Sequence, residues 1–155
     1  MDATDREILT RLQADGRLPN AALAEAVHLS PSPCLRRVRR LEAEGVIAGY
    51  RAVLGRPHVG LELTVFVEIK VASPTHETAT ADLQDAISAM EEVVACYIVS
   101  GDADLLLEVV TPGLAAFERF LMGRLLLLPG VANVRSNFAI RTVKRDGPLP
   151  LGHLG

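Results

Sequence analysis

Residues 29–45 read LSPSPCLRRVRRLEAEG, a proline-containing start followed by a basic stretch. Proline is tolerated in the first turn of a helix, where its missing N–H has no partner to lose, so Ser32 and Pro33 predict a helix start. Gly45 predicts the helix end. Three apolar residues recur at helical spacing and predict the buried stripe: Leu35, Val38 and Leu41. We therefore expect an amphipathic helix over residues 32–44.

The face of this helix opposite the stripe is basic. At about 100° per residue, the polar residues that fan over the exposed side are Ser32, Arg36, Arg39 and Arg40, with Arg37 at the edge. Arginine binds guanine and phosphate through paired hydrogen bonds, so this face predicts contact with nucleic acid. The alternative is a solvated basic face beside the glutamates near the helix end.

Two shorter helical patterns precede the basic helix. Apolar residues at helical spacing predict one helix that begins after Asp2 and ends before Gly16. Asn20 predicts the cap of a second helix, which ends before Leu29. Only a few residues separate the second and third helices. This is the spacing of a helix-turn-helix, in which the second helix of the pair enters the major groove of DNA.

The second half of the chain alternates between strand and helix patterns. Every odd position from Leu61 to Val71 is apolar, which predicts a strand with one buried face. A helical pattern follows, with Ala79, Leu83, Ile87 and Met90 on one face. Residues 93–99 and 105–110 predict a hairpin, residues 112–128 a helix that is apolar nearly all round, and residues 131–144 a last strand. The order β-α-β-β-α-β predicts a ferredoxin-like sandwich, so the whole chain is α+β.

Composition and charge exclude some classes of protein. The chain has 155 residues, of which 49% are hydrophobic and 23% charged, and this mixture excludes a disordered chain. The net charge of −3 hides a basic part, because residues 1–56 carry nine arginines against seven acidic residues, while residues 57–155 carry seven basic residues against twelve acidic ones. A polyanion responds to local charge, so DNA binding is not excluded. No apolar run approaches the roughly 18 residues of a membrane span, and we expect a cytoplasmic protein without a membrane partner.

Metal and enzyme chemistry are not indicated. Cys34 and Cys96 form no Cys-x-x-Cys pair and are predicted to be buried free thiols. The histidines are scattered and fit no metal-binding motif: His28, His58, His76 and His153. We therefore expect no metal, no cofactor and no enzymatic activity.

The chain resembles the Lrp/AsnC family of transcriptional regulators over about residues 2–145. The runs that carry the resemblance are Asp5-Arg6-Glu7-Ile8-Leu9, Asp15-Gly16-Arg17, Leu23-Ala24, residues 29–38, residues 41–50 and the turn Gly101-Asp102-Ala103-Asp104-Leu105-Leu106. The resemblance implies a three-helix winged helix-turn-helix domain at residues 1–45 and a ferredoxin-like domain for effector binding and oligomerisation at residues 61–145. Residues 46–60 are predicted to form a hinge strand and linker, with a strand that pairs with its symmetry mate. Residues 146–155 are rich in Gly and Pro and are predicted to form a flexible tail.

The function implied by the resemblance is sequence-specific regulation of transcription. We expect a homodimer that binds double-stranded DNA and assembles further to a tetramer or octamer, with the apolar helix at residues 112–128 in an interface. Near the start of the basic helix, Ser32, Pro33 and Arg36 are predicted to contact base edges. Further along, Arg37, Arg39 and Arg40 are predicted to contact phosphate.

The resemblance also implies an amino-acid effector. A glycine turn exposes backbone N–H groups to a carboxylate, and nearby acidic side chains can hold an ammonium group. The predicted effector-binding residues, placed between dimers, are Tyr97, Gly101, Asp102, Asp104 and Ser136.

Three alternatives stay open. Sirohaem decarboxylases resemble the same two-domain arrangement, but they need basic and histidine side chains in the sandwich, where this chain is mostly acidic. A metabolic sensor of the same fold that binds no DNA would leave the arginine face unexplained. In an effector-independent regulator, the turn at Gly101 would be merely structural.

Overall fold

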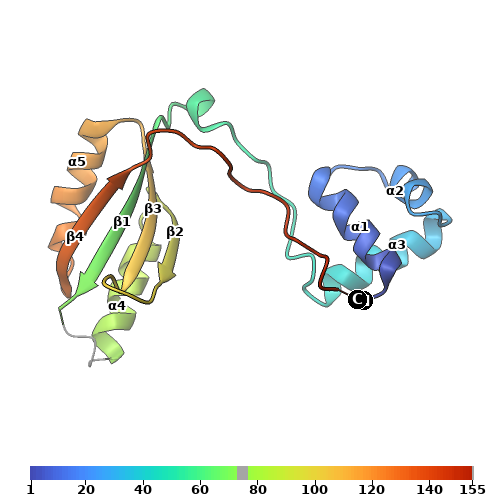
Figure 1. The fold of residues 1–155 in the computed structure, drawn as a ribbon, viewed down its shortest axis with the longest axis horizontal. Helices are drawn as coiled ribbons and strands as arrows, with labels where there is room; N and C mark the ends of the chain where they lie inside the picture. Colours follow the sequence, from blue (N-terminus) through green and yellow to red (C-terminus); the bar gives the residue numbers. More distant parts are fainter. Residues whose placement is uncertain (73–76, 155) are drawn as a thin grey trace. The chain divides into compact units, whose positions relative to one another are not determined.

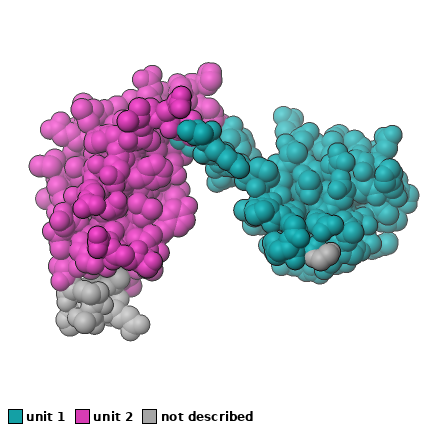
Figure 2. Space-filling view, in the orientation of Figure 1, with its two compact units in different colours: residues 1–53, 143–155 teal, residues 54–142 magenta. Residues whose placement is uncertain are grey.

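Figures 1 and 2 show two compact units in the computed structural model, which describes residues 1–72 and 77–154. The first unit combines Met1–Val53 with the segment from Val143 onward, and the second unit is Leu54–Thr142. The chain therefore leaves the first unit, builds the second and returns to the first. His76 and the side chain of Ala79 lie outside the described part.

No helix in the described ranges is both long and apolar enough to cross a membrane.

Three helices form the first unit, as the sequence predicts: α1 (Ala3–Ala14), α2 (Asn20–Ala26) and α3 (Pro31–Ala43). Their buried apolar residues make one core, which contains Ile8, Leu9, Leu23, Ala24, Val27, Cys34 and Leu41. Gly45 follows α3 with a φ of +72°, a left-handed conformation that glycine adopts without strain, so the predicted helix end is confirmed.

The buried stripe of α3 differs from the prediction by one position. Cys34 is fully buried, whereas Leu35 is 36% exposed. Leu35 and Cys34 lie three and four positions before Val38, on neighbouring parts of the same helix face. The smaller residue, Cys34, is the one that packs into the core. The stripe is therefore Cys34, Val38 and Leu41, and the prediction for Leu35 is wrong.

The start of α2 also differs from the prediction. Pro19, not Asn20, precedes the helix, and no side chain caps it. The Nδ2 group of Asn20 instead donates a hydrogen bond of 2.9 Å to the carbonyl oxygen of Pro31. This bond ties the start of α2 to the start of α3 and so holds the turn between them.

The carboxyl-terminal residues, predicted to form a flexible tail, contact α1. The backbone N–H of Leu149 donates to Oε1 of Gln13 at 2.6 Å, and Nη1 of Arg6 donates to the carbonyl oxygen of Leu154 at 2.8 Å. Leu151 packs against the core of the first unit. Composition shows that the segment is rich in Gly and Pro, but it does not show the apolar core on which Leu151 packs.

Residues 46–60 contain no strand within the described chain. Residues 48–55 have no regular structure, and a short 3-10 helix, η1 (Arg56–Val59), follows them. A strand needs a partner strand, so pairing of this segment with a second copy stays a prediction.

The second unit has the predicted β-α-β-β-α-β order. Its elements are β1 (Leu63–Val71), α4 (Glu77–Ser88), β2 (Val93–Ile98), β3 (Leu105–Thr111), α5 (Leu114–Gly123), the 3-10 turn η2 (Leu125–Leu127) and β4 (Val131–Phe138). The sheet is antiparallel in the order β2-β3-β1-β4 (Figure 1), and the predicted ferredoxin-like sandwich is confirmed. β4 ends at Phe138 rather than at residue 144, and α5 gives way to η2 instead of continuing to residue 128.

One face of this sheet is buried under the two helices. Val65, Val67 and Ile69 of β1 are fully buried, as the period-two pattern predicts. They share one core with Leu83 and Ile87 of α4 and with Phe117, Phe120 and Leu125 of the α5–η2 segment. The opposite face, called the outer face below, carries Phe66, which is 40% exposed, together with Glu68 and Lys70.

Candidate nucleic-acid interface and effector pocket

The exposed face of α3 carries Arg36, Arg39 and Arg40, and two of these have no internal partner among the described residues. Ser32, Arg36 and Arg39 are exposed, and Pro33 is half-buried. Among the described residues, neither Arg36 nor Arg39 has an ion-pair or hydrogen-bond partner for its side chain. Their guanidinium groups are therefore available to an anionic partner such as DNA.

The other two arginines of the cluster are held by carboxylates of α1. Nη1 of Arg37 lies 2.7 Å from Oδ2 of Asp2 and 2.8 Å from Oδ1 of Asp5. Nη2 of Arg40 lies 2.6 Å from Oδ2 of Asp5. We call these four residues the acid clamp. The predicted phosphate contacts Arg37 and Arg40 thus already have internal partners.

The acidic members of the clamp also cap α1. The backbone N–H of Asp5 donates to Oδ1 of Asp2 at 2.8 Å, and the backbone N–H of Asp2 donates to Oδ2 of Asp5 at 3.0 Å. This reciprocal capping box satisfies two N–H groups at the start of α1 and orients both carboxylates. It places them where α3 brings its arginines.

Hydrogen bonding in the clamp favours the charged carboxylates. The pKa of Asp2 is lowered, first by the hydrogen bond from the backbone of Asp5 and then by the one from Arg37. Burial by itself raises the pKa of Asp5, but hydrogen bonds from Asp2, Arg37 and Arg40 outweigh it, and the pKa lies below its ordinary value. The pKa of Arg37 is raised, chiefly by its hydrogen bonds to Asp2 and Asp5. The charges of Asp2, Asp5 and Arg37 therefore persist at neutral pH.

Sequence reasoning identified Asp2 only as a helix cap and gave Asp5 no role in the site. The available signal was a pair of carboxylates three residues apart in the first turn of a helix, in a domain with four clustered arginines.

The turn between β2 and β3 carries three of the predicted effector residues. Gly101 has a φ of +114°, a conformation that favours glycine, and a Cβ atom added there would meet nothing within 4 Å. Glycine is thus required by the backbone conformation and not by lack of space. Asp102 is exposed beside it.

Asp104 forms a hydrogen bond and an ion pair within the second unit. Its Oδ2 accepts a hydrogen bond of 2.8 Å from the backbone N–H of Val71, and its Oδ1 lies 3.1 Å from Nζ of Lys70. These two bonds, the backbone bond first, lower the pKa of Asp104. Asp104 therefore ties the turn to the end of β1, and its side chain is 30% exposed.

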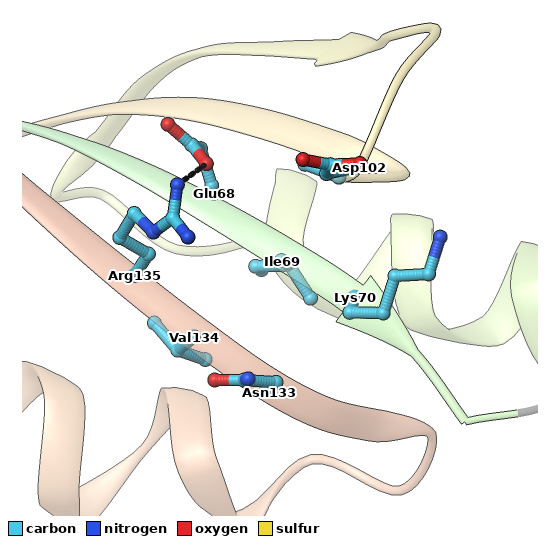
Figure 3. A pocket seen from close by; sticks show the side chains of 8 residues that line it. Glu68, Ile69, Lys70, Asp102, Asn133, Val134 and Arg135 are labelled. Atoms are coloured by element: carbon cyan, nitrogen blue, oxygen red, sulfur yellow. Dashed lines mark ion pairs between the residues drawn. The ribbon is translucent and has the colours of Figure 1, made fainter.

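A polar pocket of about 440 Å³ lies where this turn meets β1 and β4 (Figure 3). Its lining residues are Glu68, Ile69, Lys70, Asp102, Ala103, Asn133, Val134 and Arg135. Nη1 of Arg135 lies 3.6 Å from Oε2 of Glu68, and the guanidinium side chain is 71% exposed. Figure 3 shows Asp102 facing this pair from the β2–β3 turn. Charges of both signs thus border one hollow, an arrangement that suits a zwitterion.

Tyr97 and Ser136 do not line this pocket. Tyr97 pairs with Leu106, which pairs with Glu68, so Tyr97 lies on the outer face two strands from Glu68. Ser136 stands opposite the fully buried Val67 and so lies on the helix-covered side of the sheet. The structure brings Asp102 together with Glu68, Lys70 and Arg135, three residues that the sequence analysis did not select.

Among the described residues, the cysteines and histidines form no metal-binding cluster. Cys34 is buried as predicted, whereas Cys96 is only half-buried, and both are free thiols whose pKa is raised by burial. Within the described ranges, no group of three or more His, Cys, Asp or Glu residues is arranged to hold a metal ion.

Two family models match this chain, one in each half. The winged helix-turn-helix DNA-binding family matches residues 1–48, and the Lrp/AsnC ligand binding domain matches residues 64–149. The leucine-responsive regulatory protein of Escherichia coli strain K12 is 41% identical over 149 residues, which cover 96% of this chain and 90% of that protein.

Two solved structures are similar over nearly their whole length. A transcriptional regulator from Neisseria meningitidis in complex with L-methionine has a TM-score of 0.95 and 37% identity, with 99% of each chain covered. A feast or famine regulatory protein from M. tuberculosis complexed with L-methionine has a TM-score of 0.85 and 34% identity, with 94% of this chain and 95% of that chain covered. This chain, with its basic α3 face, belongs to the Lrp/AsnC family of transcriptional regulators.

Proposed function

We propose that this protein binds specific DNA sequences and regulates transcription in response to an amino acid. The observation that carries the DNA-binding part is the pair of free arginines, Arg36 and Arg39, on the exposed face of the second helix of a helix-turn-helix. Ser32, Pro33 and Arg36 contact base edges, because the amino-terminal part of such a helix enters the major groove, and Arg39 contacts phosphate. A DNA-binding protein shares a compartment with DNA, and we assign this one to the cytoplasm.

The salt dependence of DNA affinity tests this assignment. The full chain is titrated on duplex DNA from its own promoter region at several salt concentrations, as wild type, Arg36→Ala, Arg39→Ala and Arg141→Ala. Loss of Arg39 should reduce the slope of log affinity against log salt by about one, and loss of Arg36 should weaken specific binding by about 1–3 kcal/mol. Arg141 lies exposed after β4 in the second unit and supplies the control with the same change of charge. Unchanged binding by both α3 variants would contradict the assignment.

The polar pocket is the proposed site for the amino acid. Arg135 and the N–H groups of the turn at Gly101 hold the carboxylate, while Glu68 and Asp102 hold the ammonium group. Tyr97 lies on the same outer face but outside this pocket. Support comes from the charge pattern of the pocket and from the two similar structures with bound L-methionine.

Thermal-shift measurements with the twenty amino acids test the pocket. A ligand at one hundred times its dissociation constant stabilises a protein by about 2.7 kcal/mol, which raises the melting temperature measurably. We expect the shift to be lost in Arg135→Gln and in Asp102→Asn, and kept in Glu91→Gln, an exposed change in the turn before β2. A shift that survives both pocket variants would place the site elsewhere. No shift at all would favour the effector-independent regulator.

We also propose that the second unit makes the homodimer and the larger assemblies. Phe66 on the outer face and three exposed apolar residues of the α5–η2 segment, Leu114, Met122 and Leu127, offer two separate apolar surfaces. Two surfaces allow a dimer to grow into a tetramer or octamer. Light scattering on the full chain tests this, and a monomer at micromolar concentration would contradict it.

We propose no enzymatic activity. No histidine is among the described residues that line the polar pocket, which makes a tetrapyrrole substrate a poor fit. A Soret band in the purified protein would instead favour the sirohaem decarboxylase alternative.

A further inference from the structure

We propose that Asp5 is a positioning residue for DNA recognition, and that it acts by holding Arg37 and Arg40 within the domain and fixing α3 on α1. The proposal rests on the proposed function, because it concerns how the same helix reads DNA. It changes the assignment of half of the arginine cluster: Arg36 and Arg39 contact DNA, whereas Arg37 and Arg40 act through Asp5.

The contacts of Asp5 fix the position of α3 at two points. Oδ1 of Asp5 is 2.8 Å from Arg37, and Oδ2 is 2.6 Å from Arg40, which comes one turn later on α3. A single ion pair would let the helix turn about the contact. Two charge-assisted bonds to the two oxygens of one carboxylate restrain both rotation and sliding of α3.

The carboxylate of Asp5 is itself held rigidly. Its side chain is 2% exposed, and its Oδ2 also accepts the backbone N–H of Asp2 at 3.0 Å. Asp2 adds a second carboxylate on Arg37 at 2.7 Å. A carboxylate with so many donors around it has little room for another geometry, so the restraint on α3 is a stiff one.

The clamp also decides which charges face DNA. Two of the four arginines form ion pairs with Asp2 and Asp5. The other two, Arg36 and Arg39, remain on the exposed face. Removing the Asp5 charge should therefore have two opposite effects. It releases positive charge toward any DNA, and it loosens the helix orientation that specific recognition needs.

Binding of the full chain to two DNA duplexes separates these effects. The duplexes are its promoter site and a scrambled duplex of the same length. Asp5→Asn keeps the size of the side chain and removes its charge. We expect affinity for the promoter site to fall about ten-fold, while affinity for the scrambled duplex rises several-fold with a steeper salt dependence. A purely structural role would lower both affinities, and a purely electrostatic role would raise both.

Glu7→Gln is the matched control, because it makes the same charge change on the same helix. Glu7 pairs with Arg11 of α1, and both side chains are about half exposed. This variant should bind both duplexes slightly more tightly, because it loses one negative charge. The ratio of specific to non-specific affinity should stay at the wild-type value. A ratio in Asp5→Asn equal to that in Glu7→Gln would overturn the proposal.

A second variant decides the matter even where Asp5→Asn fails to fold. Arg40→Gln removes one clamp arginine whose side chain is 46% exposed. If Arg40 acts through Asp5, this variant keeps the wild-type salt slope, whereas Arg39→Ala lowers the slope by about one. Equal losses of slope in both variants would overturn the proposal and leave the proposed function standing. A wild-type chain that does not discriminate between the two duplexes would overturn both.

Discussion

Two groups of charged side chains, the acid clamp of the first unit and the polar pocket of the second, use the same residue types for different ends. In the clamp, Asp5 is buried and its arginines lie 2.6–2.8 Å away. In the pocket, Glu68 and Arg135 lie 3.6 Å apart and Arg135 is largely exposed. In a short buried ion pair, the donors and acceptors bond each other and stabilise the fold. In a long exposed pair, most of these donors and acceptors can still bond a ligand. Burial, more than residue type, separates a structural pair from a binding pair.

Loss of the clamp carboxylate should give the largest effect on stability. Asp5→Ala leaves two guanidinium groups without their buried partner and removes part of the α1 cap. Because Arg37 and Arg40 keep access to water, we expect the first unit to lose about 2–3 kcal/mol, less than the roughly 3–5 kcal/mol of a fully buried pair. Amide hydrogen exchange, compared between α1–α3 and the sheet, measures this loss. If Asp102→Ala, at the exposed pocket rim, accelerated hydrogen exchange equally, the clamp and the pocket would not differ in their contribution to stability.

Lowering the pH should reduce the difference in stability between the wild type and a variant without the Asp5 carboxylate. The pKa of Asp5 is lower in the folded chain than the ordinary value of about 3.9, so its contribution to stability is fully present above that value. The contribution is lost as the pH falls through the folded pKa. We therefore expect the stability gap between wild type and Asp5→Asn to be constant from pH 7 to about pH 5 and to shrink below pH 4. Hydrogen exchange in α1 across this range checks the sign, and a gap that widens in acid would contradict it.

The carboxyl-terminal segment should have an intermediate effect on the unit that holds the clamp. Leu151 is half-buried against the first-unit core, and Leu151→Ala should cost about 1 kcal/mol. Leu149 is 71% exposed and makes its hydrogen bonds to Gln13 through the backbone, so Leu149→Ala should change stability by less than about 0.5 kcal/mol. Equal values for the two leucines, measured by exchange in α1, would show that the segment is not seated as described.

The smallest effect is expected in the pocket. Glu68→Gln removes one partner of a long and exposed ion pair, and it should change the stability of the second unit by less than about 0.5 kcal/mol. Hydrogen exchange of the amides of β1 and β4 measures the change. A loss comparable to that of Asp5→Ala would mean that this pair is structural.

Sequence predicted most of the fold because its strongest patterns are unambiguous. Alternation with period two over β1 leaves one choice of buried face, and Val65, Val67 and Ile69 occupy it. Helical spacing is less decisive. Positions 34 and 35 both lie on the inward side of α3, and only packing shows that Cys34 is the buried one.

The candidate sites depended on contacts between distant segments, and these were harder to predict. Ser136 belongs to the helix-covered face because the register of β4 on β1 sets it opposite Val67. The same register sets Arg135 opposite Glu68 and so builds the polar pocket. The acid clamp needs the packing of α1 against α3, which neither helix reveals alone.

The central claim is that the free arginines of α3 bind DNA, and footprinting tests it most directly. Hydroxyl-radical footprints of the full chain are compared on its own promoter region for wild type, the double variant Arg36→Ala with Arg39→Ala, and Arg141→Ala. We predict protection in two patches about one helical turn (roughly 34–36 Å) apart for wild type and Arg141→Ala, and its loss in the double variant. The same protection in the double variant, or none in the wild type, would contradict the claim.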